Sequence, residues 1–272
     1  MKTSRTFLST ARDSLAHWAA HARLERLRGK TEDARKVYQT VLVASARPRT
    51  RPGISKLWWD WAELEWLSGE SEAAINVIVR SAGVDATGGI RILRSRGNLE
   101  EIVATEMRWQ DREAWIKLLA LLECLTTSMD AALAGFDRHL AGFEDGSIAQ
   151  ESLAVASLIL LYRQVTVLKH PTPPVLLRSR VEKVMEIYPS NSIVLGMFLE
   201  AEKGQGVWGR VRGLLGEGTK DKDVARRAME VWIPGWEKGR WHSEKERIRN
   251  GLSVAVDSER WVIHDILRRR LC

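Results

Sequence analysis

Apolar residues recur along the chain at the three- and four-residue spacing of amphipathic helices, and no stretch shows the sustained alternation of a strand. The segment 18–42 (WAAHARLERLRGKTEDARKVYQTVL) matches 58–82 (WWDWAELEWLSGESEAAINVIVRSA). The structural positions of this repeat include Trp18 and Trp58, Glu25 and Glu65, and Gly29 and Gly69. A glycine between two helical patterns is typical of the left-handed residue that ends the first helix. The two segments are offset by about 40 residues, and self-similarity at a period of about 40 residues predicts stacked helical hairpins.

Weaker copies of the repeat follow. At a shift of 58 residues, the positions Ile116, Glu123, Ala132 and Phe136 repeat Trp58, Glu65, Ala74 and Ile78. Further helical pairs are predicted at 150–168 with 175–188 around the helix breaker HPTPP, at 192–204 with 210–215, and at 228–239 with 246–256. We therefore expect an all-α chain. Its predicted architecture is a right-handed α-solenoid of about six antiparallel hairpins over residues 1–258, with a divergent basic tail over 259–272.

Four tryptophans lie within LWWDWAELEW, residues 57–66. On a helical wheel, Trp58 and Trp61 fall on the same arc as Leu57, which is the predicted core side of the hairpin. Trp59 and Trp66 fall opposite Leu57. They either pack on a neighbouring hairpin or face a protein partner, so they are candidate partner-binding residues.

The repeated glutamates Glu25 and Glu65 fall inside the apolar arc, where a carboxylate requires a partner. We expect Arg35 to pair with Glu25 inside the first hairpin. For Glu65 the expected partner is Arg80 or a backbone amide of the next hairpin. Because the glutamate recurs at the same repeat position, an ion pair that holds the helices together is favoured over a catalytic role.

The positive charge is concentrated at the start of the chain. Residues 1–56 hold 13 Lys and Arg against 4 Asp and Glu, whereas the rest holds 29 against 31. This permits contact with RNA or an acidic partner, although a solvated helix face is an equal alternative. Two arginine-rich segments, ARPRTRPG (46–53) and IRILRSRG (90–97), are interpreted as loops. They supply the candidate RNA contacts Arg47, Arg49, Arg51, Arg91, Arg94 and Arg96.

Motifs for other chemistry are weak. GQGVWG (204–209) follows a helical segment instead of a strand, which favours a connection between helices over a nucleotide site. HWAAH (17–21) has the histidine spacing of a zinc helix, but no third ligand is evident. We expect neither an enzyme nor a metal or cofactor site. The two cysteines, Cys124 and Cys272, fit a reducing compartment, and no apolar run reaches membrane-spanning length.

The pattern W-x-x-W/H-A-x-x-E, a turn glycine, then A-R-x-V-Y resembles the HAT (half-a-TPR) repeat, with its first copy running from Trp18 to Tyr38. LWWDWAELEWLSGESEAAINVIVRSAG and YPSNSIVLGMFLEAEKGQGVWGRVRGLL are most similar to the nuclear-RNAi-defective (NRDE) family, a resemblance that covers residues 12–256. Members of that family have a long disordered N-terminal region, whereas this chain begins with a repeat. Functions tied to that region are therefore not carried over.

The resemblance implies a nuclear, non-catalytic scaffold of RNA silencing and surveillance. The implied partners are splicing factors and an exosome-associated helicase, with effects on RNA decay and heterochromatin. A HAT scaffold of splicing or 3′-end processing is one alternative. A direct RNA-binding module that uses the basic N-terminal quarter is another, and a homodimer is compatible with both.

Overall fold

A computed structural model describes residues 13–198, apart from residues 46, 47, 49, 86, 87, 189, 190, 192 and 195. Within these residues the ordered elements are α-helices and two short π-helical segments, and none is a strand. The chain is all-α, as the sequence predicts. It divides into two compact units, Met1–His170 and Pro171–Cys272, and the boundary falls within the helix breaker HPTPP.

The first two hairpins have the same turn. Helix α2 (Leu15–Leu27) pairs with α3 (Thr31–Tyr38), which continues into the π-helical segment η1 (Gln39–Ala44), and α4 (Ile54–Leu67) pairs with α5 (Ser71–Ser81). Gly29 and Gly69 have φ values of 74° and 84°, in the left-handed region. Lys30 and Glu70 each lie immediately before the second helix, and their N–H groups donate to the carbonyls of Glu25 and Glu65, at 2.9 and 3.0 Å, which closes both turns. The predicted hairpin turns are confirmed.

The third predicted pair also forms. Helix α7 (Trp109–Thr126) packs against α8 (Met129–Leu140), in which Ala132 and Phe136 are fully buried. Helix α9 (Ile148–Tyr162) follows and continues into the π-helical segment η2 (Arg163–Val167). Together these two elements match the helical segment predicted at 150–168.

An extra helix, α6 (Ile90–Thr105), lies between the second and third pairs and packs against α5 and α7. The segment IRILRSRG forms its first half, so the interpretation of that segment as a loop is wrong. The reason is visible farther along the same helix, because Leu99 and Val103 extend a buried side that begins at Ser95. The segment therefore has an inner face and is held as a helix by its neighbours.

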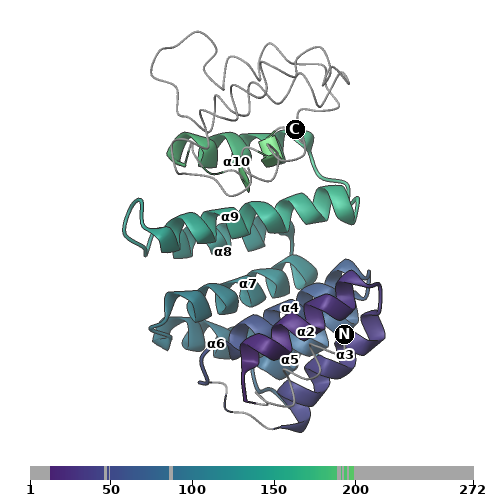
Figure 1. Ribbon diagram of the computed structural model, residues 1–272. Helices are drawn as coiled ribbons and strands as arrows, with labels where there is room; N and C mark the ends of the chain where they lie inside the picture. The colour runs from purple at the N-terminus through teal and green to yellow at the C-terminus, as the bar shows by residue number, and fades with distance from the viewer. Residues whose placement is uncertain are drawn as a thin grey trace, which may run out of the picture. The chain divides into compact units, whose positions relative to one another are not determined.

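Within the first unit the hairpins meet in chain order. Helix α4 contacts α2 and α7, and α7 in turn contacts α9. Figure 1 shows α7 between the group α2–α5 and the pair α8 and α9. The hydrophobic core of this unit runs through all of these helices. Helix α4 lies at its centre, and twelve of its residues are buried.

The described part of the second unit begins with α10 (Pro174–Ile187), which confirms the helix predicted at 175–188. Proline is well suited to this first position because its missing N–H would have no partner within the helix. Residues 193, 194 and 196–198 are helical, at the start of the segment predicted as a helix at 192–204. The rest of that pair, the pair predicted at 228–239 with 246–256, the GQGVWG segment and the tail 259–272 lie outside the described residues.

Candidate functional site between the helical hairpins

Tryptophan stacking forms the inside of the second hairpin. Trp58 and Trp61 are buried and stack with their ring centroids 5.8 Å apart, and Tyr38 of α3 stacks on Trp61 at 6.2 Å. The core positions predicted for Trp58 and Trp61 are therefore confirmed. Trp18, the counterpart of Trp58 in the first hairpin, is partly buried against the same core.

Trp59 and Trp66 are also buried, with exposed fractions of 8% and 2%. Lys117 of α7 covers Trp59, and its Nζ lies 4.8 Å from the ring centroid. Of the two alternatives drawn from the sequence, packing between helices holds. The assignment of these two residues to a partner-binding surface is therefore corrected. They lie on the side of α4 opposite Leu57, but neighbouring helices pack against that side as well, so both faces of α4 are buried.

The glutamate of the second repeat is held by the first hairpin. Arg35 Nη2 lies 2.6 Å from Glu65 Oε2, Arg35 Nε lies 2.9 Å from Glu65 Oε1, and Trp61 Nε1 donates to the same Oε1 at 2.8 Å. The expected pair between Arg35 and Glu25 is thus wrong, and neither Arg80 nor a backbone amide of the next hairpin is the principal partner of Glu65. Packing of α3 on α4 brings the arginine to the next hairpin instead of its own.

Glu25 uses local partners. Arg28 Nη1 lies 3.4 Å from Glu25 Oε2, and His21 Nε2 lies 4.0 Å from Oε1. His21, one histidine of the HWAAH segment, is therefore beside a carboxylate of its own helix. Among the described residues there is no group of three side chains suited to holding a metal ion.

The third copy repeats the tie between neighbours. Glu123 of α7 occupies the same repeat position as Glu65, and its Oε1 lies 2.5 Å from Nε of Arg96 on α6. Arg96 Nη2 also donates to Glu123 Oε2 at 2.9 Å. In both copies an arginine of the preceding helix holds the repeated glutamate, so this pair joins successive elements.

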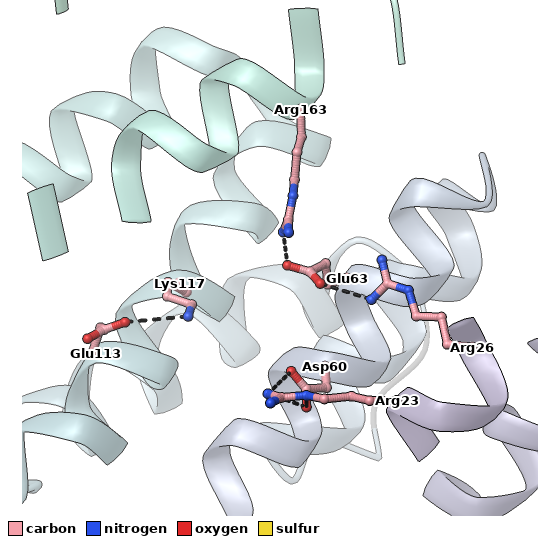
Figure 2. Close-up of polar contacts among 7 residues, drawn as sticks. All are labelled: Arg23, Arg26, Asp60, Glu63, Glu113, Lys117 and Arg163. Carbon is pink, nitrogen blue, oxygen red and sulfur yellow. Dashed lines mark hydrogen bonds and ion pairs between the residues drawn. The ribbon is translucent and has the colours of Figure 1, made fainter. Parts of the chain in front are cut away.

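A second set of ion pairs runs along α4, where Asp60 and Glu63 are 6% and 7% exposed. Arg23 of α2 donates to both oxygens of Asp60, at 3.0 and 3.1 Å. Figure 2 shows Glu63 between Arg26 of α2, at 3.0 Å, and Arg163 of η2.

One carboxylate therefore contacts residues from the first and fourth helical pairs predicted from the sequence. On α7, which packs against α4, Lys117 Nζ lies 3.4 Å from Glu113 Oε1 (Figure 2).

Electrostatics explains much of the charge asymmetry of the sequence. Burial raises the pKa of Asp60 above its usual range, and the hydrogen bonds from Arg23 oppose that shift. The same contact raises the pKa of Arg23. Three arginines of the first hairpin meet three carboxylates of α4, in the pairs Arg23–Asp60, Arg26–Glu63 and Arg35–Glu65. These carboxylates act as acceptors that fix helix positions, so part of the basic excess is neutralised inside the fold.

Most of the candidate RNA contacts that the structure describes already have partners within the fold. Arg47 and Arg49 lie outside the described residues, and Arg51 donates to the backbone carbonyl of Asp13. Arg91 is engaged by Asn76 and Glu72, and Arg96 is engaged by Glu123. Arg94 is exposed and has no hydrogen-bond or ion-pair partner in the described part of the chain. Arg51 and Arg91 line different grooves.

The groove that contains Arg91 was not foreseen from the sequence. It has a volume of about 640 Å³ and lies among α3, η1, α4, α5 and the start of α6. Its apolar lining includes Ala73 and Val77 of α5, which are one helical turn apart. Its charged residues are balanced, with Arg35, Arg80 and Arg91 against Glu65, Glu70 and Asp85.

No helix in the described part of the chain is long and apolar enough to cross a membrane. Neither a family model nor a curated protein matches the sequence.

Proposed function

We propose that this chain is a non-catalytic scaffold of nuclear RNA silencing and surveillance, built as a right-handed α-solenoid of HAT-type hairpins. The observation that supports this proposal best is the repeated tie between neighbours, Arg35 with Glu65 and Arg96 with Glu123. Ion pairs of this kind hold successive helical elements together, which is how stacked repeats build an extended surface. The succession of contacts from α2 to α4, α7 and α9 supports the same arrangement.

The groove beside α5 suits a polypeptide partner. It combines aliphatic side chains with equal numbers of acidic and basic residues, so it does not select a uniformly charged polymer. The resemblance to the NRDE family supports splicing factors and an exosome-associated helicase as the partners. In that setting the scaffold would link these proteins to RNA decay and heterochromatin.

Affinity purification from nuclear extract, with and without ribonuclease, tests the proposal. We expect splicing or helicase proteins to remain bound after ribonuclease treatment. Glu70→Lys changes an exposed residue of the groove, and Glu101→Lys makes the same charge change on the exposed side of α6. Loss of partners with Glu70→Lys alone would support the groove. Recovery of chaperones only, or loss of every partner with ribonuclease, would contradict the scaffold proposal.

Direct RNA binding is the second candidate. The exposed Arg94, which has no partner among the described residues, and the basic composition of residues 1–56 favour it. An RNA-binding surface releases counterions, so its affinity should fall steeply with salt. Neutralising Arg47, Arg49 and Arg51 would then flatten this salt dependence. A scaffold of splicing or 3′-end processing would instead be recognised by the identity of the ribonuclease-resistant partners.

A further inference from the structure

A second groove, of about 530 Å³, runs between α2 and the segment that leads into α4. Ala16, Ala19 and Ala20 of α2 line one side, and Pro52 and Gly53 contribute to the other. The three alanines are spaced so that they share one helix face, where their small side chains leave room for another chain to approach. The surface they provide is aliphatic.

The rim of this groove is basic. Arg23, Arg51 and Lys56 line it, and Asp13 is the one acidic residue among its described lining residues. Lys56 is exposed and has no hydrogen-bond or ion-pair partner in the described ranges. The Arg23 side chain keeps 61% of its surface exposed although it pairs with Asp60. Arg51 donates to a backbone carbonyl, which leaves its positive charge uncompensated by that contact.

The charge of the two adjacent segments, residues 1–12 and 46–53, argues against either of them as the occupant. Residues 1–12 contain Lys2, Arg5 and Arg12 and no acidic residue, and the arginine-rich segment 46–53 is also basic. Like charges repel, so these segments are poor complements to a basic rim. An occupant from outside the chain with acidic side chains is favoured by charge complementarity.

The lining also distinguishes polypeptide from nucleic acid. Single-stranded RNA is held by aromatic side chains on which its bases stack, and no aromatic residue lines the described part of this groove. Aliphatic residues instead suit apolar side chains of a peptide. We propose that this groove binds an acidic segment of a partner protein, with apolar side chains against the alanines and carboxylates at Arg23, Arg51 and Lys56. The inference rests on the proposed scaffold function and assigns one surface to it.

Selection from a random peptide library on the purified full chain, followed by fluorescence anisotropy with the selected peptides, tests this assignment. We expect peptides that combine Asp or Glu with apolar residues. Lys56→Glu should weaken their binding by about fivefold or more, since it removes one favourable contact and adds a repulsive one. Arg94→Glu is the matched control, because it makes the same change in net charge at an exposed site on α6 that does not line this groove.

Ala20→Gln adds bulk to the groove without adding charge, at an exposed helical position that tolerates glutamine. It should weaken peptide binding but not binding of an oligouridine probe. Selected peptides without acidic residues, or equal effects of Lys56→Glu and Arg94→Glu, would overturn the assignment. Displacement of the peptides by oligouridine would also overturn it in favour of RNA. If partner proteins still co-purify after ribonuclease treatment, the scaffold proposal stands even when this groove assignment fails.

Discussion

Arg35 Nη2 lies 2.6 Å from Glu65 Oε2, so the second helix of one hairpin is joined directly to the first helix of the next. The carboxylate is nearly buried, with a side-chain exposure of 5%, and it also accepts a hydrogen bond from Trp61. A buried carboxylate without its partner is strongly destabilising, whereas an exposed pair contributes little. Contacts of this kind make the orientation of neighbouring hairpins specific.

Glu63→Gln should destabilise the chain by about 2–3 kcal/mol in urea unfolding, because it removes the charge that both Arg26 and Arg163 approach. The two guanidinium groups would then repel each other in a half-buried environment. The helix content of the folded state should be unchanged in circular dichroism.

Glu72→Gln is the control for that substitution, since Glu72 also pairs with an arginine, Arg91, but is exposed. We expect a loss of about 0–0.5 kcal/mol. Equal losses for the two variants would mean that burial of Glu63 has no energetic consequence.

Gly69→Ala should cost about 1–2 kcal/mol, because a side chain at a φ of 84° meets its own backbone. Gly135 lies inside α8, has no positive φ, and an added Cβ would find open space there. Gly135→Ala should therefore stabilise the chain by up to about 1 kcal/mol. Thermal unfolding of both variants checks the opposite signs, and a stabilising Gly69→Ala would contradict the left-handed turn.

Trp66→Ala should cost about 3–5 kcal/mol, as expected for a large side chain removed from a core. Met107→Ala, at a residue with 91% of its surface exposed, should change the free energy of unfolding by less than about 0.5 kcal/mol. Chemical denaturation distinguishes the two. A Trp66→Ala variant of normal stability that loses partners would restore Trp66 to a binding surface.

Cys124 should react slowly with thiol reagents, because burial raises the pKa of its thiol to about 11. In a Cys272→Ser variant, alkylation of the folded chain at pH 8 should be roughly a hundredfold slower than in denaturant, with the rate rising about tenfold for each pH unit. The unfolded thiol ionises first, so the free energy of unfolding should fall as pH rises above about 8.5. A rate that reaches its plateau near pH 9 would contradict this.

The sequence predicts much of the first unit because its repeat is local. Gly29 and Gly69 occupy equivalent turns, and the same register places Glu25 and Glu65. Period and turn chemistry depend on neighbouring residues along the chain, so they can be recognised before any packing is known.

The partner of Arg35 could not be recognised in this way. The pattern aligns Arg35 with Glu25 across one turn, but the packing of α3 on α4 selects Glu65. Similarly, the arginines of IRILRSRG led to the prediction of a loop, although the segment begins helix α6. The inner residues of α6, such as Leu99, are buried by contacts with α5 and α7. In both cases the outcome depends on contacts between hairpins, which local periodicity does not describe.

A double-mutant cycle at Arg35 and Glu65 tests most directly the claim that basic residues of the first hairpin bind the second hairpin. Arg35→Met, Glu65→Gln and the double variant would be compared with the unmodified chain by urea unfolding. A coupling free energy of about 2 kcal/mol is predicted, because the double variant avoids an unpaired buried charge. Losses that add to within about 0.5 kcal/mol would contradict the tie between hairpins and leave Arg35 free for an external partner.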